Sequence, residues 1–268
     1  MARSFDGTND FLSAAAVDLS AENKITVVYD AFQPSFPNDD GILLEVTNNF
    51  NNTEDTILII PNSSTVSGYS FIIHSTGAGP NYTEGHFPLP STSAFHKYVL
   101  EFDQSVNPNT LKAWVDGVSQ TITYIQQSIQ TDHSFHGSET YYFGMRGGAS
   151  LPWAGRQQEF AIFSGGLTAG QIKAHSVGAS PDLIGKPIYY WRMIGRASPE
   201  PERMKGADAT VNGATQIAHN RVVYPSRPPI VLVPAAVAAA GRIMSSLAGP
   251  GGLAGPGGIA GQGGGLAG

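Results

Sequence analysis

Short apolar runs, separated by turn-forming residues, follow one another through the first 166 residues of the chain. The runs are rich in Val, Ile, Tyr and Phe, and Asn, Ser, Gly and Pro fill the gaps between them. About ten strands at such regular spacing predict an antiparallel sandwich or barrel, because βαβ units would place longer helical segments between strands. The strands are expected at residues 26–32, 41–47, 56–62, 69–75, 96–104, 110–125 (two strands around a turn), 139–147 and 155–165.

Residues 96–104 show how the strands are expected to pack. Tyr98, Leu100 and Phe102 fall on one face of this strand, and the mostly charged residues between them fall on the other. Successive side chains of a strand point to opposite faces of the sheet. The alternation predicts a sandwich sheet with one buried face and one largely hydrated face.

Two dipeptides predict tight turns. Asp116-Gly117 lies between two apolar runs, and Asn212-Gly213 lies within residues 209–215. Both dipeptides readily supply the positive φ angles of a primed turn. The first is expected to close a hairpin.

A single short helix is expected after the main run of strands. Thr168 is a suitable N-cap for it and Gly178 a suitable stop. Residues 186–193 then predict one further strand. The fold class predicted is therefore all-β, with one short helix.

The composition changes after Tyr224, where a proline-rich stretch favours an extended chain. Glycine then recurs at every third position from Gly249 to Gly264. A period of three matches a polyproline II or polyglycine II path and would align aliphatic side chains along one edge. This predicts a domain at residues 1–224 and an extended Pro/Ala/Gly-rich assembly arm at 225–268. Its expected contact residues are Ile230, Val231, Leu232, Leu247, Leu253 and Ile259.

Two alternatives for the arm stay open: a flexible linker, or a short collagen-like triple helix formed with two other copies. The charge distribution favours an attachment role. Residues 1–140 hold 4 basic and 16 acidic residues, whereas residues 141–268 hold 11 basic and 5 acidic residues. The acidic residues 1–140 would repel other copies of the chain, and the basic residues 141–268 would contact a partner. Basic residues scattered over hydrated surfaces would give the same charge count.

Three stretches resemble the LamG-like, concanavalin A-like jelly-roll superfamily. "SFDGTNDFLS" is similar to its first strand pair, "LKAWVDGVSQ" to an internal strand–turn–strand, and "GRQQEFAIFSGGLTAGQIKA" to a late strand that continues into a short helix. Together they bracket residues 4–177. The resemblance implies a jelly-roll sandwich.

The stretch from Tyr189 to Ser226 resembles an extension that follows LamG-like domains in proteins of tailed bacteriophages and uncultured viruses. An aromatic strand precedes "SPEP", and "TVNGAT" follows a Gly/Asp turn. His219-Asn220 departs from the usual His-Pro of that extension. The resemblance implies a virion protein without locating it on the particle.

Candidate contacts with a ligand lie near "MRGGASLPWAGR". Trp153 is flanked by Arg146 and Arg156. An exposed Trp between arginines suits contact with a sugar or a protein. The alternative is an aromatic residue that covers the rim of the core.

Each group of residues that could bind a metal ion also fits another role. Oxygen donors that would suit calcium cluster at Asp6, Asn9 and Asp10, but the same residues suit a hairpin turn stabilised by their own side chains. The same two interpretations apply to Asp39-Asp40. Another metal candidate is the pair His133 and His136, for which a solvated loop is the alternative.

The sequence lacks the motifs of several function classes. The hydrolase branch of the superfamily that the chain resembles carries Glu-x-Asp-x-Glu on one strand, and Glu101 and Asp103 lack the second Glu of that pattern. No nucleophile elbow or phosphate-binding loop occurs in the sequence. Basic residues are too sparse for nucleic-acid binding. The sequence contains no run of twenty unbroken apolar residues, so no transmembrane helix is predicted. Cysteine is absent.

The function expected from the sequence is therefore a non-enzymatic structural protein on the virion surface of a tailed phage, either a capsid decoration or a fibre-like component. Its expected partners are copies of itself, for which a trimer is one arrangement, the major capsid protein and host surface glycans. No cofactor is expected. The alternatives are a carbohydrate-binding adhesin and a subunit of a cellular surface filament.

Overall fold

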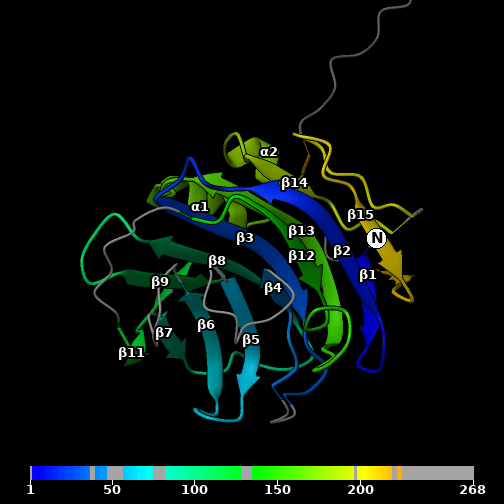
Figure 1. Cartoon of the computed structure of the whole chain (residues 1–268), viewed down its shortest axis with the longest axis horizontal. Helices are drawn as coiled ribbons and strands as arrows, with labels where there is room; N and C mark the ends of the chain where they lie inside the picture. Colours follow the sequence, from blue (N-terminus) through cyan, green and yellow to red (C-terminus); the bar gives the residue numbers. More distant parts are fainter. Residues whose placement is uncertain are drawn as a thin grey trace, which may run out of the picture. The chain divides into compact units, whose positions relative to one another are not determined.

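The predicted jelly-roll sandwich is confirmed. The computed structural model describes residues 2–36, 40–46, 57–74, 82–127, 135–195, 198–218 and 222–224, which form two facing antiparallel sheets (Figure 1). Sheet A contains β1 (Ala2–Asp6), β3 (Lys24–Phe32), β8 (Phe95–Asp103), β9 (Thr110–Val115), β10 (Val118–Gln120), β13 (Ala154–Ser164), β14 (Tyr189–Trp191) and β16 (Thr215–Ile217). Sheet B contains β2 (Phe11–Asp18), β4 (Leu44–Val46), β5 (Ile57–Ser63), β6 (Gly68–His74), β7 (Tyr82–Phe87), β11 (Thr123–Gln126), β12 (Ser138–Phe143) and β15 (Ala209–Asn212).

The order of the strands within each sheet differs from their order in the sequence. Sheet A runs β10-β9-β8-β3-β13-β1-β16, with β14 also paired to β13, and sheet B runs β11-β7-β6-β5-β4-β12-β2-β15. Consecutive strands such as β1 and β2 belong to different sheets. The chain therefore crosses repeatedly between the two layers, and the core forms where their inner faces meet.

Three stacked tyrosines lie at the centre of the core. The ring of Tyr98 lies 4.9 Å from those of Tyr29 and Tyr69, and the hydroxyl oxygens of Tyr29 and Tyr69 are 2.7 Å apart. Burial raises the pKa of both of these hydroxyls. Each hydroxyl finds its hydrogen-bond partner in the other, so the aromatic packing leaves neither group unsatisfied.

The predicted helix is present as α1 (Ala169–Ser176), followed by a short second helix, α2 (Pro181–Ile184), that the sequence did not predict. Thr168 is the N-cap of α1: its hydroxyl accepts a hydrogen bond from the Gln171 amide, and the Gln171 side chain accepts one from the Thr168 amide. This reciprocal arrangement is a capping box. Gly178, just past the helix, has a φ of +102° that favours glycine.

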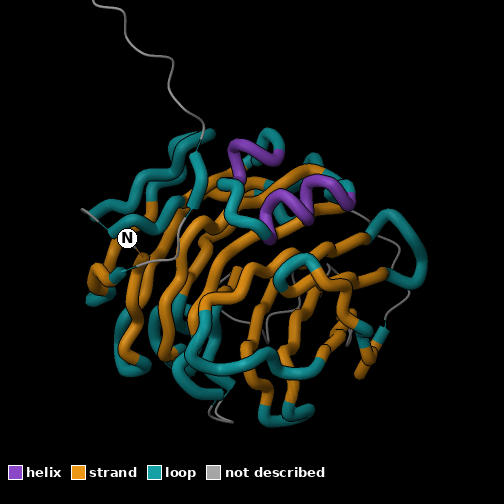
Figure 2. The backbone as a smooth tube through the Cα atoms, turned by 180° about the vertical axis from the view of Figure 1, so that it is seen from behind, coloured by secondary structure: helices purple, strands orange, loops and turns teal. Residues whose placement is uncertain are grey.

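The expectation of a largely hydrated outer face on β8 is wrong. Lys97 is 8% exposed and Glu101 4%. The reason is that α1 and α2 cover this side of sheet A (Figures 1 and 2), where Ile172 and Ile184 pack in one apolar cluster with Val99. The helices cover the middle of the sheet and leave its β1 end uncovered.

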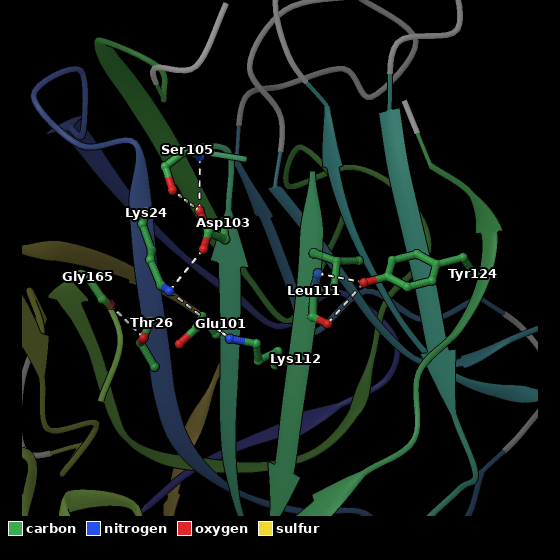
Figure 3. A network of polar contacts seen from close by, with 9 residues as sticks. All are labelled: Lys24, Thr26, Glu101, Asp103, Ser105, Leu111, Lys112, Tyr124 and Gly165. Carbon is green, nitrogen blue, oxygen red and sulfur yellow. Dashed lines mark hydrogen bonds and ion pairs between the residues drawn. The ribbon is translucent and has the colours of Figure 1, made fainter. Parts of the chain in front are cut away.

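Charged residues on that covered face are paired. Lys24 Nζ lies 3.0 Å from Glu101 Oε1 and 2.9 Å from Asp103 Oδ2, and Lys112 Nζ lies 2.8 Å from Glu101 Oε1 (Figure 3). Each carboxylate thus has a cation within reach, which offsets its desolvation. Glu101 and Asp103 hold three neighbouring strands of sheet A together.

A tyrosine at one edge of sheet B forms hydrogen bonds to sheet A. The hydroxyl of Tyr124 in β11 accepts a hydrogen bond from the Leu111 amide at 2.9 Å and donates one to the Leu111 carbonyl at 3.2 Å (Figure 3). Leu111 belongs to β9 of sheet A, whereas β11 belongs to sheet B. This contact closes one side of the sandwich.

The two predicted turns differ in what they connect. Asp116-Gly117 closes the β9–β10 hairpin, with φ angles of +52° and +79°. Asn212-Gly213 instead connects β15 in sheet B with β16 in sheet A. β15 and β16 therefore add one strand to the edge of each sheet, beside β2 and beside β1. The opposite side of the sandwich is closed in this way.

The predicted arm at 225–268, with Ile230, Val231, Leu232, Leu247, Leu253 and Ile259, lies outside the described residues and stays a prediction. In the described part of the chain, neither helix has the length and apolar character that crossing a membrane requires.

Candidate functional site

The outer face of sheet B carries a row of aligned side chains. Glu45 of β4 pairs with Leu58 of β5, Leu58 with Ile72 of β6, and Ile72 with Glu84 of β7. Their sequence neighbours Ile59, Phe71 and Ile73 point inward to the main core. Period-2 alternation therefore places two carboxylates and two aliphatic side chains in line on the outer face.

A cavity of about 220 Å³ lies over this row. Its floor is apolar: Ile42, Leu58, Ile60 and Ile72 form a cluster separate from the main core, and Leu151 packs against it. Its remaining lining is polar, charged or aromatic. These residues are Asp40, Ser63, Thr65, Tyr82, Glu84 and Arg146.

Glu84 supplies the buried acceptor of the cavity. It is 9% exposed, and Ser70 on β6 donates a hydrogen bond to its Oε1 at 2.8 Å. Burial raises the pKa of this carboxyl, and the Ser70 hydrogen bond opposes the shift. A ligand hydroxyl at this carboxylate would meet a strong acceptor in a poorly hydrated place.

Arg146 supplies a donor on another wall. Its Nε lies 3.4 Å from Oε1 of the fully buried Glu45. The loop after β12 holds its backbone, because the Arg146 amide donates to the Ser150 carbonyl at 2.8 Å. Gly147 and Gly148, with φ angles of +55° and +68°, make this tight return possible. The Gly-Gly pair thus positions the arginine over the cavity.

Tyr82 supplies an aromatic wall. It is half-buried, and its ring stacks on that of His74 with centroids 5.9 Å apart and planes 16° from parallel. The cavity therefore combines an aromatic face and an aliphatic floor with a few directed polar groups. Such a mixture suits a ligand that has both C–H faces and hydroxyl groups.

The two carboxylates of the row are not a hydrolytic pair. Three strand spacings separate Glu45 from Glu84, which is about 14 Å at the usual distance between neighbouring strands. Glycosidase carboxylates lie roughly 5–9.5 Å apart. The separation of Glu45 and Glu84 therefore does not match that of a glycosidase pair.

The structure separates the three residues predicted around Trp153. Arg146 lines the sheet B cavity, whereas Arg156 lines a different hollow on sheet A. Trp153 is 2% exposed, and its indole N–H donates to Gln33 Oε1 at 2.6 Å. The hypothesis of an exposed Trp contact is wrong, because the ring packs against Phe5 in the core.

The candidate metal ligands are used in hydrogen bonds. Asp6 Oδ1 accepts from the Thr8 amide at 2.8 Å, and Asp10 Oδ2 accepts from the Asp6 amide at 3.0 Å. The Asx-turn interpretation of Asp6, Asn9 and Asp10 therefore describes the geometry. Across the described ranges, no three His, Asp or Glu side chains gather to hold a metal ion.

Only some of the other candidate metal ligands lie within the described residues. Asp40 accepts a hydrogen bond from the Ser64 amide at 2.6 Å, and its neighbour Asp39 lies outside the described residues. His136 is buried against the Tyr141 hydroxyl at 3.1 Å, and burial lowers its pKa to about 4. His133 lies outside the described residues.

A Ser–His–Asp arrangement that the sequence did not reveal lies at the end of β8. His96 Nδ1 is 2.6 Å from Asp116 Oδ2, and His96 Nε2 is 3.0 Å from Ser91 Oγ and 2.9 Å from the Ser91 carbonyl oxygen. A carbonyl oxygen only accepts, so Nε2 must carry a proton to bond it. The hydrogen bond to Asp116 raises the pKa of His96, which favours that doubly protonated ring. These hydrogen bonds connect the Asp116-Gly117 turn to the start of β8 and to Ser91.

Sequence reasoning missed Tyr82 and Glu84 because it missed β7 itself. The segment 82–87 alternates Tyr, Glu and His with Thr, Gly and Phe, which is the period of a strand. Only Phe87 is strongly apolar on the inward side, and Gly85 weakens the signal. A strand with so little apolar character is recognised only from its alternation.

Comparison with known proteins agrees with the fold. No family model matches the sequence, and no curated protein matches it. A solved structure of a candidate carbohydrate-binding protein from Bacteroides ovatus shares the fold, with 18% identity over 83% of this chain and 61% of that one, and a TM-score of 0.55. This chain thus spans about three fifths of that protein.

Weaker structural similarities involve two further proteins. They are the heptameric SAP-like pentraxin from Limulus polyphemus (14% identity, 65% of this chain, 81% of that one, TM-score 0.47) and the CBM40 domain of a Ruminococcus gnavus IT-sialidase bound to α2,3-sialyllactose (15%, 66%, 98%, TM-score 0.43). The chain has a concanavalin-like jelly-roll fold.

Proposed function

We infer that this protein is a non-enzymatic carbohydrate-binding protein and that the cavity on sheet B is its binding site. The observation that carries this proposal is the placement of Tyr82, Glu84 and Arg146 around one apolar floor. The fold shared with a candidate carbohydrate-binding protein of Bacteroides ovatus supports it. Of the functions expected from the sequence, this was the alternative to the virion role.

Recognition would divide between apolar and polar contacts. The C–H face of a sugar ring packs against Tyr82 and the floor at Leu58 and Ile72, while ring hydroxyls donate to Glu84 and accept from Arg146. Ser70 already donates to one Glu84 oxygen, which orients the carboxylate before the ligand arrives. Preorganised groups lose less freedom on binding, which favours affinity.

A glycan array probed with the full chain tests the proposal. Hits are then titrated against Glu84→Gln and Tyr82→Ala, each of which should weaken binding about tenfold, roughly 1.4 kcal/mol, by removing one directed contact. Lys173→Gln, at an exposed position of α1, is the matched control and should bind within about twofold of the parent. Tyr82→Phe keeps the ring if Tyr82→Ala fails to fold. No glycan hit, or hits unaffected by the cavity variants, would reject the proposal.

A location on the virion surface stays a separate prediction. It rests on the resemblance of residues 189–226 to phage extensions, and it is compatible with glycan binding because a displayed sandwich domain would meet host glycans. Electron microscopy of native particles labelled with an antibody against residues 1–224 tests it. Particles without label would contradict it.

A further inference from the structure

A second hollow lies on the outer face of sheet A, at the end that the helices leave uncovered. Register aligns Ser4 of β1 with Arg156 of β13, and Arg156 with Phe32 of β3. The hollow around this row has a volume of about 220 Å³. The other polar, apolar and small residues that line it include Asp6, Pro34, Ala154 and Gly155.

The floor of this hollow is closely packed. A Cβ at Gly155 would lie 2.2 Å from the Trp153 ring and 2.7 Å from the Phe32 carbonyl oxygen, so only glycine fits there. Trp153 lies beneath, packed on Phe5 with ring centroids 5.5 Å apart. The buried indole therefore supports the floor from the inner side. A supported floor holds its lining groups in fixed positions.

Arg156 contacts an aromatic ring within this hollow. Its guanidinium carbon lies 4.4 Å from the centroid of the Phe32 ring, a cation–π contact that restrains the side chain. Among the described residues, no carboxylate forms an ion pair with it. Its planar fork of N–H donors is thus preorganised and available to a ligand.

Two further groups narrow the class of ligand. The Asp6 carboxylate also lines the hollow, with its Oδ1 occupied by the Thr8 and Asn9 amides. A bare anion would be repelled by Asp6, whereas a ligand with hydroxyl groups could donate to it. The Ser4 hydroxyl adds a second small polar contact. A ligand with a carboxylate and hydroxyl groups in the same molecule would match both Arg156 and Asp6.

We propose that this hollow binds a sugar acid, with the ligand carboxylate paired to the Arg156 guanidinium and ring hydroxyls donating to Asp6. Arginine and carboxylate match in a two-bond geometry that lysine does not reproduce. The volume lies below the roughly 300–1,000 Å³ of drug-sized ligand sites, so it suits a single ring. The inference rests on the proposed carbohydrate-binding function but assigns a second site and a charged sugar.

Titration of the full chain with three probes tests the inference, using amide chemical shifts as the readout. Sodium D-glucuronate should bind saturably at the amides of Ala154 and Arg156, at least tenfold tighter than D-glucose or acetate. Glucose has the ring without the charge, and acetate has the charge without the ring. Equal binding by glucose, or equal binding by acetate, would overturn the assignment to a sugar acid.

Variants locate the site. Arg156→Gln should weaken glucuronate binding at least tenfold, and Arg156→Lys should weaken it by an intermediate factor because it keeps the charge and loses the fork. Arg203→Gln, at an exposed arginine elsewhere, is the matched control and should bind as the parent does. Unchanged glucuronate binding by Arg156→Gln would overturn the inference.

Glu84→Gln separates this inference from the proposed function. It should leave glucuronate binding unchanged while weakening the array hits of the sheet B cavity. Glucuronate binding that depends on Glu84 and not on Arg156 would overturn the inference and leave the proposed function standing. Glucuronate binding that depends on Arg156, with no Glu84-dependent array hit, would support the inference and reject the sheet B site.

Discussion

At the scale of single residues, two buried glutamates explain the "SPEPE" stretch. Glu200 is 1% exposed and accepts hydrogen bonds from Arg3 Nε at 3.1 Å and from the Ile194 and Gly195 amides at 3.0 Å. Glu202 accepts from the Tyr190 amide at 2.7 Å and from amides of the following turn. Glu200 therefore fastens the C-terminal extension to β1, and Glu202 connects the turn after it to β14.

Glu200→Ala should lower the free energy of unfolding by about 3–5 kcal/mol, because it leaves the buried Arg3 without its anion. Urea denaturation measures the change. Asp182→Ala, which removes an exposed carboxylate in α2, is the control and should cost about 1 kcal/mol or less. Equal losses for both variants would contradict the role assigned to the buried pair.

Glu159 gives the chain a pH dependence. It is 2% exposed, accepts hydrogen bonds from the hydroxyls of Tyr190 and Tyr224, and burial raises its pKa to about 7. The folded state then keeps a proton that the unfolded chain releases near pH 4.5. The resulting stability is complete below about pH 4.5 and is lost as the pH rises through about 7.

Glu159→Gln should remove this contribution. The free energy of unfolding of the parent should fall relative to the variant between about pH 4.5 and 7, by up to about 1.4 kcal/mol per pH unit. Urea denaturation of both proteins from pH 4 to 8 measures the difference. Parallel curves would show that Glu159 titrates normally.

At the scale of elements, the Asn212-Gly213 turn shows why local signals leave pairing open. The dipeptide predicts a turn, and Gly213 has a φ of +76°. It does not predict that β15 and β16 enter different sheets. That outcome follows from β1 and β2, which already lie in different sheets and offer an edge to each new strand.

Gly213→Ala should destabilise the fold by more than about 1 kcal/mol, because the new Cβ would combine a positive φ with a position 2.0 Å from Asp10 Oδ1. Gly206→Ala is the matched control: its φ is +80°, and nothing lies within 4 Å of the added Cβ. Thermal unfolding of both variants isolates the clash. Equal shifts in Tm would mean that Asp10 moves aside without cost.

The same scale shows how far sequence reasoning reached the site. Most strands, the N-cap Thr168 and the Asp116-Gly117 hairpin followed from local patterns. Arg146 and Arg156 were identified as candidates, but as one cluster around an exposed Trp153. In the structure Arg146 follows β12 of sheet B, and Arg156 belongs to β13 of sheet A. Trp153, which lies between them in the sequence, is buried in the core. Tyr82 and Glu84 were missed because polar residues hide the period of β7.

At the scale of the whole molecule, the three apolar clusters draw on residues from Phe5 to Ala214 in the described part of the chain. The predicted domain at 1–224 therefore contains every described core residue. Tyr224 contributes its hydroxyl to Glu159, and the Arg192 guanidinium lies 3.7 Å from its ring centroid. The predicted boundary after residue 224 stays a prediction, because residues 225–268 lie outside the described residues.

A chain that ends at Tyr224 should fold and unfold cooperatively, with a Tm within a few degrees of the full chain, because it keeps both sheets. If residues 225–268 are the assembly arm, light scattering on a sizing column should show a loss of oligomers on truncation. A truncated chain that keeps the parent oligomer would contradict the assembly role of Leu247, Leu253 and Ile259.

Local patterns sufficed to predict the all-β class, the inward-facing residues of strands such as β8, and the short capped helix, because alternation, turn dipeptides and caps act over a few residues. No local pattern predicted that α1 and α2 cover the middle of the outer face of sheet A, that Trp153 is buried, or that Glu84 and Arg146 share a cavity. Those outcomes depend on contacts between residues far apart in the chain, and the pairing of strands across two sheets creates them.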